Sequence, residues 1–165
     1  MTKSRKAVFC GGDRRAVSKG SRHSPQCVSL GYQGQSLDGL CRLLLAHDVV
    51  TLIDVRQNAW SNRPEFRKGR LKEAVNAVGV EYIHLSGAGN PFRPKPGEEL
   101  GFAECARRYR KYIVGRKDVL ESVYAIACGQ VAAVLCSEHE SAMCHRSVLL
   151  EEVCRCDGPI SEKRI

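Results

Sequence analysis

The stretch that decides the fold is Val-Ala-Ala-Val-Leu-Cys-Ser-Glu-His-Glu-Ser-Ala-Met-Cys-His-Arg-Ser, residues 131–147. It begins with a short apolar run that ends at Leu135, which is typical of a buried strand. Polar residues follow from Cys136, and the apolar pattern of a helix begins after Cys144. A strand, a polar loop and a helix start that carry thiol, imidazole, carboxylate and guanidinium groups predict a site at the carboxyl edge of an α/β sheet.

Strand and helix patterns alternate along the rest of the chain. Strands are expected at 27–32, 49–55, 80–85 and 131–135. Helices are expected at 37–45, 71–78, 102–113, 119–128 and 144–154. The runs at 49–55 and 131–135 are apolar on both faces, as parallel strands covered by helices are. The alternation predicts a three-layer α/β/α fold with a mostly parallel sheet of four or more strands.

The length of 165 residues predicts one domain with one substantial core. We expect this domain to span residues 27–156, between a basic flexible tail at 1–26 and a loose C-terminal tail at 157–165. The chain carries a net charge of +8, but residues 1–26 alone hold seven basic residues and one acidic residue. The folded part is therefore nearly neutral, and any non-specific affinity for phosphate groups is expected mainly from the N-terminal tail.

Composition excludes a membrane protein and favours the cytoplasm. No apolar run approaches the ~20 residues that a membrane-spanning helix needs, and no apolar stretch follows the basic N-terminus as in a secretory signal. Nine cysteines are scattered without a repeating frame. We expect a cytoplasmic protein whose cysteines are reduced.

Parallel strands end at one edge of their sheet, which predicts that polar residues following different strands meet there. Glu138 and Asp54 are candidates for general acid/base catalysis. Cys144 stands at a helix start, where free amide groups favour a thiolate, and either this residue or Cys136 could be a nucleophile. The simpler alternative is two packed thiols and an ion pair from Arg146 to Asp54 or Glu138. The expected catalytic set is Cys136, Cys144, His145, Glu138 and Asp54.

The loops at the same edge are expected to bind an anionic substrate. The turn at 31–34 lets backbone approach a ligand, and basic residues mixed with aromatic ones can hold phosphates and stack bases. The expected substrate-binding residues are Gly31, Tyr32, Gly34, Arg56, Ser61, Phe66, His84 and Arg146.

A metal centre is considered and not expected. Cys136, Cys144 and His145, with Glu138 or with Cys154 and Cys156, are ligand types that zinc accepts. The chain has no Cys-x-x-Cys pair, however, which is the spacing typical of structural zinc sites. We therefore expect no metal and no cofactor.

Five short segments carry a family resemblance. They are Gly-Tyr-Gln-Gly-Gln-Ser at 31–36, Asp-Val-Arg at 54–56, Tyr-Ile-His-Leu at 82–85, Leu-Cys-Ser-Glu at 135–138 and Cys-His-Arg-Ser at 144–147. In order and spacing, over about residues 28–155, the chain resembles the family called domain of unknown function 488. The resemblance implies a compact three-layer α/β fold with a site at these segments, and it implies no particular reaction.

Three functions are compatible with these residues. The leading hypothesis is an enzyme that hydrolyses or cleaves a nucleotide-like or nucleic-acid substrate. The second is a thiol-dependent transferase of sulfur or acyl groups through Cys144 or Cys136. The third is a non-catalytic module that binds a nucleotide or nucleic acid. The sequence predicts neither the substrate nor the oligomeric state.

Overall fold

The computed structural model of the protein describes residues 25–93, 101–140 and 144–165. The predicted basic tail lies outside the described residues, apart from its last two positions. Among the described helices, none combines the length and apolar composition that crossing a membrane requires.

The centre of the molecule is a five-stranded sheet in which every described strand pair is parallel. The strands are β1 (Gln26–Gly31), β2 (Thr51–Asp54), β3 (Glu81–His84), β4 (Ala132–Cys136) and β5 (Ser161–Arg164), in the spatial order β3-β2-β4-β1-β5. The decisive stretch thus forms the central strand. The predicted fold class, a three-layer α/β/α arrangement around a parallel sheet, is confirmed.

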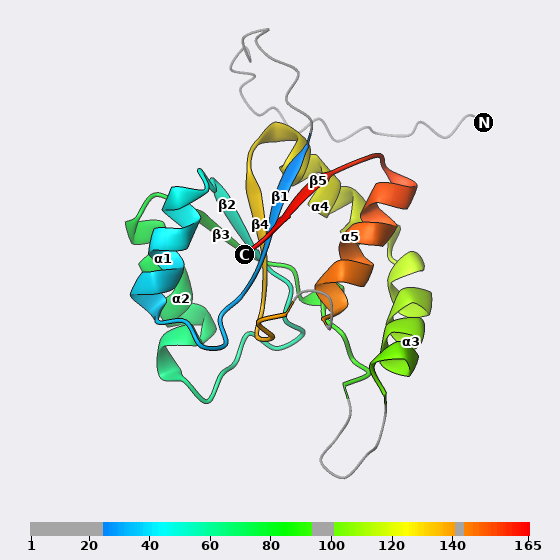
Figure 1. Ribbon diagram of the computed structural model, residues 1–165, viewed down its shortest axis with the longest axis horizontal. Coiled ribbons are helices and arrows are strands. Elements are labelled where there is room, and N and C mark those ends of the chain that lie inside the picture. The colour runs from blue at the N-terminus through cyan, green and yellow to red at the C-terminus, as the bar shows by residue number, and fades with distance from the viewer. Residues whose placement is uncertain (1–24, 94–100, 141–143) are drawn as a thin grey trace, which may run out of the picture.

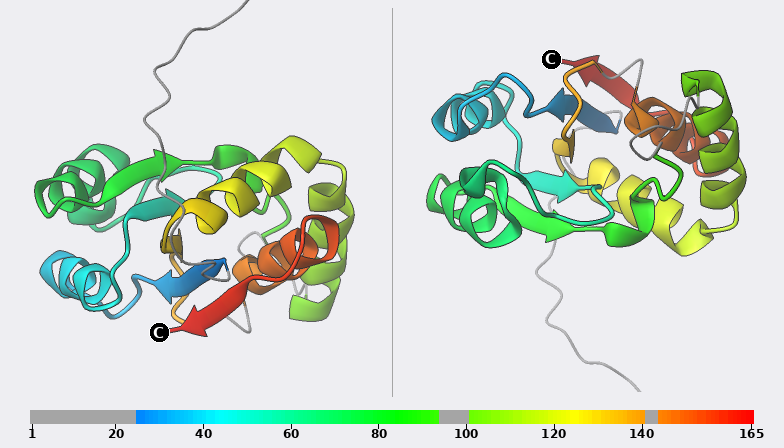
Figure 2. Two further views of the ribbon diagram at one scale, coloured as in Figure 1. Left: turned by 90° about the horizontal axis from the view of Figure 1, so that it is seen from above. Right: turned by 90° about the horizontal axis from the view of Figure 1, so that it is seen from below.

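Helices cover both faces of this sheet (Figures 1 and 2). The helices are α1 (Leu37–Ala46), α2 (Lys68–Ala77), α3 (Phe102–Val114), α4 (Lys117–Gly129) and α5 (His145–Cys156), with short 3-10 turns η1 (Pro64–Phe66) and η2 (Ser86–Ala88). Helices α1 and α2 lie on one side, and α3, α4 and α5 lie on the other (Figure 1).

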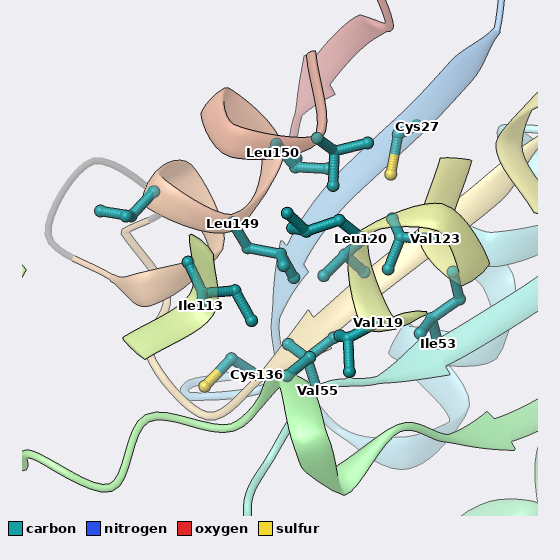
Figure 3. Packing of buried hydrophobic residues seen from close by; sticks show 14 of the residues in the cluster. Cys27, Ile53, Val55, Ile113, Val119, Leu120, Val123, Cys136, Leu149 and Leu150 are labelled. Carbon is teal, nitrogen blue, oxygen red and sulfur yellow. The ribbon is translucent and has the colours of Figure 1, made fainter. Parts of the chain in front are cut away.

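The two faces of the sheet bury separate apolar clusters. In β4, Val134 packs into the cluster with α3, α4 and α5, while the neighbouring Leu135 packs into the cluster with α1 and α2. Successive residues of a strand point to opposite faces of the sheet. Because helices cover both faces, both side chains are fully buried. Figure 3 shows the first cluster, with Cys136 at one end of it beside Val55.

Two local signals in the sequence mark helix ends. Ser36 caps α1, since its hydroxyl accepts a hydrogen bond from the Gly39 amide at 3.0 Å. Gly79 follows α2 with a φ of 83°, the left-handed conformation that glycine adopts without strain. These signals fix where α1 begins and where α2 ends.

The end of the chain differs from the expected loose tail. Residues 161–164 form β5, which pairs with β1 from Gln26 to Ser29 and adds an edge to the sheet. The segment reads Ser-Glu-Lys-Arg and has no apolar alternation. Charged edge strands resist pairing with other chains, and this same property removes the apolar pattern by which a strand is recognised in a sequence.

Candidate functional site

The polar residues after β4 and at the start of α5 fold back on one another. Cys136 is the last residue of β4, and Cys144 is the N-cap residue of α5, immediately before His145. Both thiols are buried, and both lie against the same carboxylate oxygen. Glu138 Oε2 accepts hydrogen bonds from Cys136 Sγ at 2.6 Å and from Cys144 Sγ at 3.2 Å. The sequence-predicted Cys-x-Glu and Cys-His elements therefore form one cluster.

The orientation of His145 is set by its surroundings. Its Nε2 lies 3.1 Å from the Val55 carbonyl oxygen. A carbonyl can only accept, so Nε2 carries the proton and donates it. The Tyr109 ring packs edge-on against the imidazole, with ring centroids 5.3 Å apart. The other nitrogen, Nδ1, faces Cys144 Sγ at 3.5 Å and Cys136 Sγ at 3.7 Å. In neutral His145 this nitrogen presents a lone pair to the two thiols.

The two thiols differ in acidity. Hydrogen bonding from Cys144 lowers the pKa of Cys136 well below its ordinary value, although burial opposes this effect. The bond to Cys136, together with burial, raises the pKa of Cys144. Of the two thiols, Cys136 is therefore the more acidic.

Arg93 joins the cluster and is absent from the predicted site residues. Its NH2 group donates to Cys136 Sγ at 3.3 Å and to Ser137 Oγ at 3.1 Å, and it also forms an ion pair with Glu138. The charges of Glu138, Cys136 and Cys144 raise the pKa of Arg93 despite its desolvation. The sequence places Arg93 among the basic residues of the loops expected at this edge, a signal that does not distinguish a site residue from a solvated one.

Asp54 and Arg56 form a separate unit beneath the edge. Asp54 is fully buried, and Arg56 is 5% exposed. Arg56 donates to the two carboxylate oxygens through Nε at 2.8 Å and NH2 at 2.5 Å. The Tyr82 hydroxyl donates to Oδ2 at 2.6 Å. Asp54 thus holds Arg56, whose NH1 also donates to the Phe66 carbonyl at 2.8 Å, and it does not join the Glu138 cluster.

Arg146 contacts backbone rather than either predicted carboxylate. The residue is fully buried, and its NH2 group donates to the carbonyl oxygens of Glu138 at 2.7 Å and His139 at 3.3 Å. The alternative ion pair from Arg146 to Asp54 or Glu138 is not formed among the described residues. Arg146 instead fixes the loop that carries Glu138.

The glycine turn after β1 approaches this same loop. A Cβ atom on Gly31 would lie 1.8 Å from the Glu138 carbonyl oxygen, so only glycine allows the two backbones to pass. The Tyr32 and Gln33 amides then donate to the carbonyls of Cys136 and Ser137 at 3.2 and 3.0 Å. The close backbone approach predicted for a ligand is thus made to the chain itself. Gly34 adopts a φ of 80° in the turn that follows.

A cavity of about 180 Å³ opens beside the cluster. Arg93, Ser137 and His145 line it and also contact the cluster residues. The remaining lining consists of amide, aromatic and guanidinium side chains from Tyr32, Arg56, Gln57, Asn58, Trp60 and Asn90. Trp60 is 60% exposed, and the Arg67 guanidinium lies 5.4 Å from its ring centroid. The cavity therefore offers hydrogen-bonding groups and an accessible aromatic surface.

Three other predicted binding residues, Phe66, Ser61 and His84, do not line the cavity. Phe66 is fully buried and stacks on Tyr32, with ring centroids 4.3 Å apart. The Ser61 hydroxyl accepts from the Arg63 amide at 3.2 Å. His84 Nε2 lies 2.9 Å from the Arg56 carbonyl oxygen, to which it donates. These three residues shape the loops rather than the cavity surface.

The cluster could hold a metal ion. Cys136 Sγ, Glu138, Cys144 Sγ and His145 Nδ1 place one ligand atom each within 4.8 Å of one another. The chain lacks the Cys-x-x-Cys spacing typical of zinc sites, but the start of α5 places Cys144 and His145 beside Cys136.

A family model covers most of this structure. Domain of unknown function DUF488 matches residues 36–153. The chain belongs to the DUF488 family. The match includes the Cys136–His145 cluster, Arg93 and the Asp54–Arg56 pair, and it confirms the resemblance seen in the sequence. No curated protein and no solved structure matches the chain.

Proposed function

We propose that this DUF488 protein is a hydrolase that acts on a small, planar, polar compound of the nucleobase or nucleotide type, with Glu138 as general base. One observation carries the proposal. A half-buried carboxylate, two thiols and an oriented imidazole form one cluster, and the imidazole also lines a cavity of amides and aromatic rings.

The lining supports the substrate class. Proteins bind an isolated base through hydrogen bonds to its polar edge and by stacking on its face. Gln57, Asn58 and Asn90 supply amide groups, and Tyr32 and Trp60 supply aromatic ones. The cavity is smaller than the ~300–1,000 Å³ of typical ligand pockets. It therefore suits one ring rather than a long stretch of nucleic acid.

The position of Glu138 supports its role. Its side chain is 35% exposed, whereas Asp54 is fully enclosed. Glu138 can take a proton from water, whose oxygen then bonds to the electrophilic carbon of the substrate. The bond from that carbon to the leaving nitrogen breaks, and the nitrogen takes the proton from Glu138. Arg93 keeps the carboxylate in place through their ion pair.

The test is to incubate the protein with a panel of bases, nucleosides and nucleotides and to measure the release of ammonia or free base. Glu138→Gln should lower kcat/KM by about 10²–10⁴-fold, the usual effect of losing a general base. The matched control is Glu140→Gln, which removes an exposed carboxylate two positions away and should leave the rate unchanged. Equal rates for the two variants would contradict the proposal.

A thiol-dependent transferase is the second candidate, because His145 Nδ1 faces both sulfurs. It requires a covalent adduct on Cys136 or Cys144. Rapid acid quenching and intact-mass measurement should show none if the hydrolase proposal holds, and product should contain oxygen from ¹⁸O-labelled water. An adduct without oxygen incorporation favours the transferase. Ligand binding without turnover of any compound favours the binding module.

A further inference from the structure

The structure assigns a zinc site to Cys136, Cys144 and His145, with Sγ, Sγ and Nδ1 as the three ligand atoms. Water is assigned to the fourth position, with Glu138 beside it. This inference goes beyond the hydrolase proposal and does not depend on it, because metal binding is measured without substrate.

Distances between the ligand atoms fit a tetrahedral ion. Zinc binds sulfur at about 2.3 Å and imidazole nitrogen at about 2.0–2.1 Å, so a sulfur and a nitrogen on one tetrahedron lie about 3.5 Å apart. The two measured separations are 3.5 Å from Nδ1 to Cys144 Sγ and 3.7 Å from Nδ1 to Cys136 Sγ. The side chains therefore need little movement to coordinate a common ion.

The tautomer of His145 is the one that a metal requires. Metal-bound histidines usually donate their second ring nitrogen to a carbonyl or carboxylate, which fixes the ring and leaves the first nitrogen free to coordinate. Nε2 makes this bond with Val55, and Tyr109 packs against the ring. Tyr109 is itself held by its hydroxyl, which donates to the Ala88 carbonyl at 2.6 Å. The support is already in place in the described structure.

Ligand chemistry favours zinc over harder cations. Two thiolates and an imidazole select zinc or another soft divalent metal, whereas magnesium and calcium prefer oxygen ligands. Binding replaces the two thiol protons, which pass to solvent as two S–Zn bonds form. The ion and two thiolates are together neutral, and Arg93 balances Glu138. The buried site is thus left without net charge, which limits its desolvation cost.

The carboxylate of Glu138 lies among the same ligand atoms, and its assigned role is proton transfer, with water as the fourth ligand. Three protein ligands and a water are typical of catalytic zinc, where the ion makes its water more acidic. Zinc deaminases of nucleobases combine ligands of this type with a glutamate that moves protons and does not bind the metal. Glu138 contacts both sulfurs and pairs with Arg93 through its other oxygen, a position suited to that role.

The test is titration of the reduced, metal-free full chain with Co²⁺, followed by displacement with Zn²⁺. We expect a thiolate-to-cobalt absorption band that saturates at about one ion per chain and the release of protons on zinc binding. Cys136→Ser, Cys144→Ser and His145→Gln should each lower affinity at least about 100-fold, more than loss of a supporting residue does. Cys128→Ser and Cys156→Ser are matched controls, because both cysteines are exposed and lie outside the cluster.

Two results would overturn the site: no thiolate band in the wild-type chain, or affinities of Cys136→Ser and Cys144→Ser equal to those of the controls. Thermal unfolding of the metal-free variants verifies that each folds. Glu138→Gln should bind cobalt within about threefold of wild type if the fourth position holds water. A loss as large as that of Cys144→Ser would overturn the open position. If the wild-type chain binds cobalt and Glu138→Gln keeps full turnover, the hydrolase proposal fails and the metal site stands. If the wild-type chain binds no cobalt and Glu138→Gln loses turnover, the metal site fails and the hydrolase proposal stands.

Discussion

Two acid–arginine pairs stand at the carboxyl ends of neighbouring strands, and they have opposite surroundings. Asp54, the last residue of β2, and Arg56 are almost completely buried. Glu138, in the loop after β4, is 35% exposed, and its partner Arg93, in the loop after η2, is 50% exposed. Asp54 is surrounded by donors from Arg56 and Tyr82, whereas Glu138 faces two thiols. Both pairs join an acid to an arginine at the same sheet edge, so burial and hydrogen-bond partners distinguish the enclosed pair from the accessible one.

The largest expected effect comes from breaking the buried pair. Asp54→Asn keeps the size of the side chain but leaves the charge of Arg56 buried and unpaired. Removing one partner of such a pair typically costs about 3–5 kcal/mol of unfolding free energy. Urea denaturation of wild type and variant measures this difference. A cost below about 1 kcal/mol would mean that Asp54 is no more structural than a surface acid.

Tyr82→Phe tests how much of that pair depends on its third member. The hydroxyl donates to Asp54 Oδ2 at 2.6 Å, and burial, with the adjacent carboxylate, raises the pKa of Tyr82. Hydrogen bonds to charged groups contribute about 1.5–3 kcal/mol, so a loss of this size is expected in urea denaturation. Tyr112→Phe on α3 is the control, and a loss of equal size there would remove the special role of the Asp54 contact.

The layers and the location of the site could be predicted from sequence because both depend on local patterns. The apolar run of β4, the Ser36 cap and Gly79 are each visible in a few adjacent residues, and parallel topology then places strand ends together. The contrast between Asp54 and Glu138 could not be predicted in this way. It depends on Tyr82, which lies in another strand, and on side-chain exposure, and neither is encoded next to the acid.

Other residues escaped prediction for related physical reasons. Arg93 reaches the cluster from a loop 43 to 45 residues before its partners. Arg146 binds carbonyl oxygens, which every residue possesses, so its partners leave no mark in the sequence. Phe66 has an aromatic ring that could stack on a base, but that ring stacks on Tyr32 instead. Long-range contacts of this kind decide which polar residues at an edge reach the cavity.

Gly31→Ala tests how the loop that carries Glu138 is held in place. The added methyl group would meet the Glu138 carbonyl, and forcing extra atoms into a packed position costs about 1–3 kcal/mol. Gly69→Ala in α2 is the matched control, because its Cβ meets nothing within 4 Å. That change should stabilise the protein by about 0.5–1 kcal/mol. The same sign for both variants in urea denaturation would contradict the close approach of the two loops.

Glu138→Gln should have the smallest effect on stability. Its ion pair with Arg93 is open to solvent on both sides, and exposed pairs contribute about 0–1 kcal/mol because water screens them. Unfolding free energies within about 1 kcal/mol of wild type are therefore expected for Glu138→Gln and for Arg93→Ala. If either variant lost as much as Asp54→Asn, the two pairs would be structurally equivalent. A loss of turnover in Glu138→Gln would then reflect damage to the fold and would no longer identify a general base.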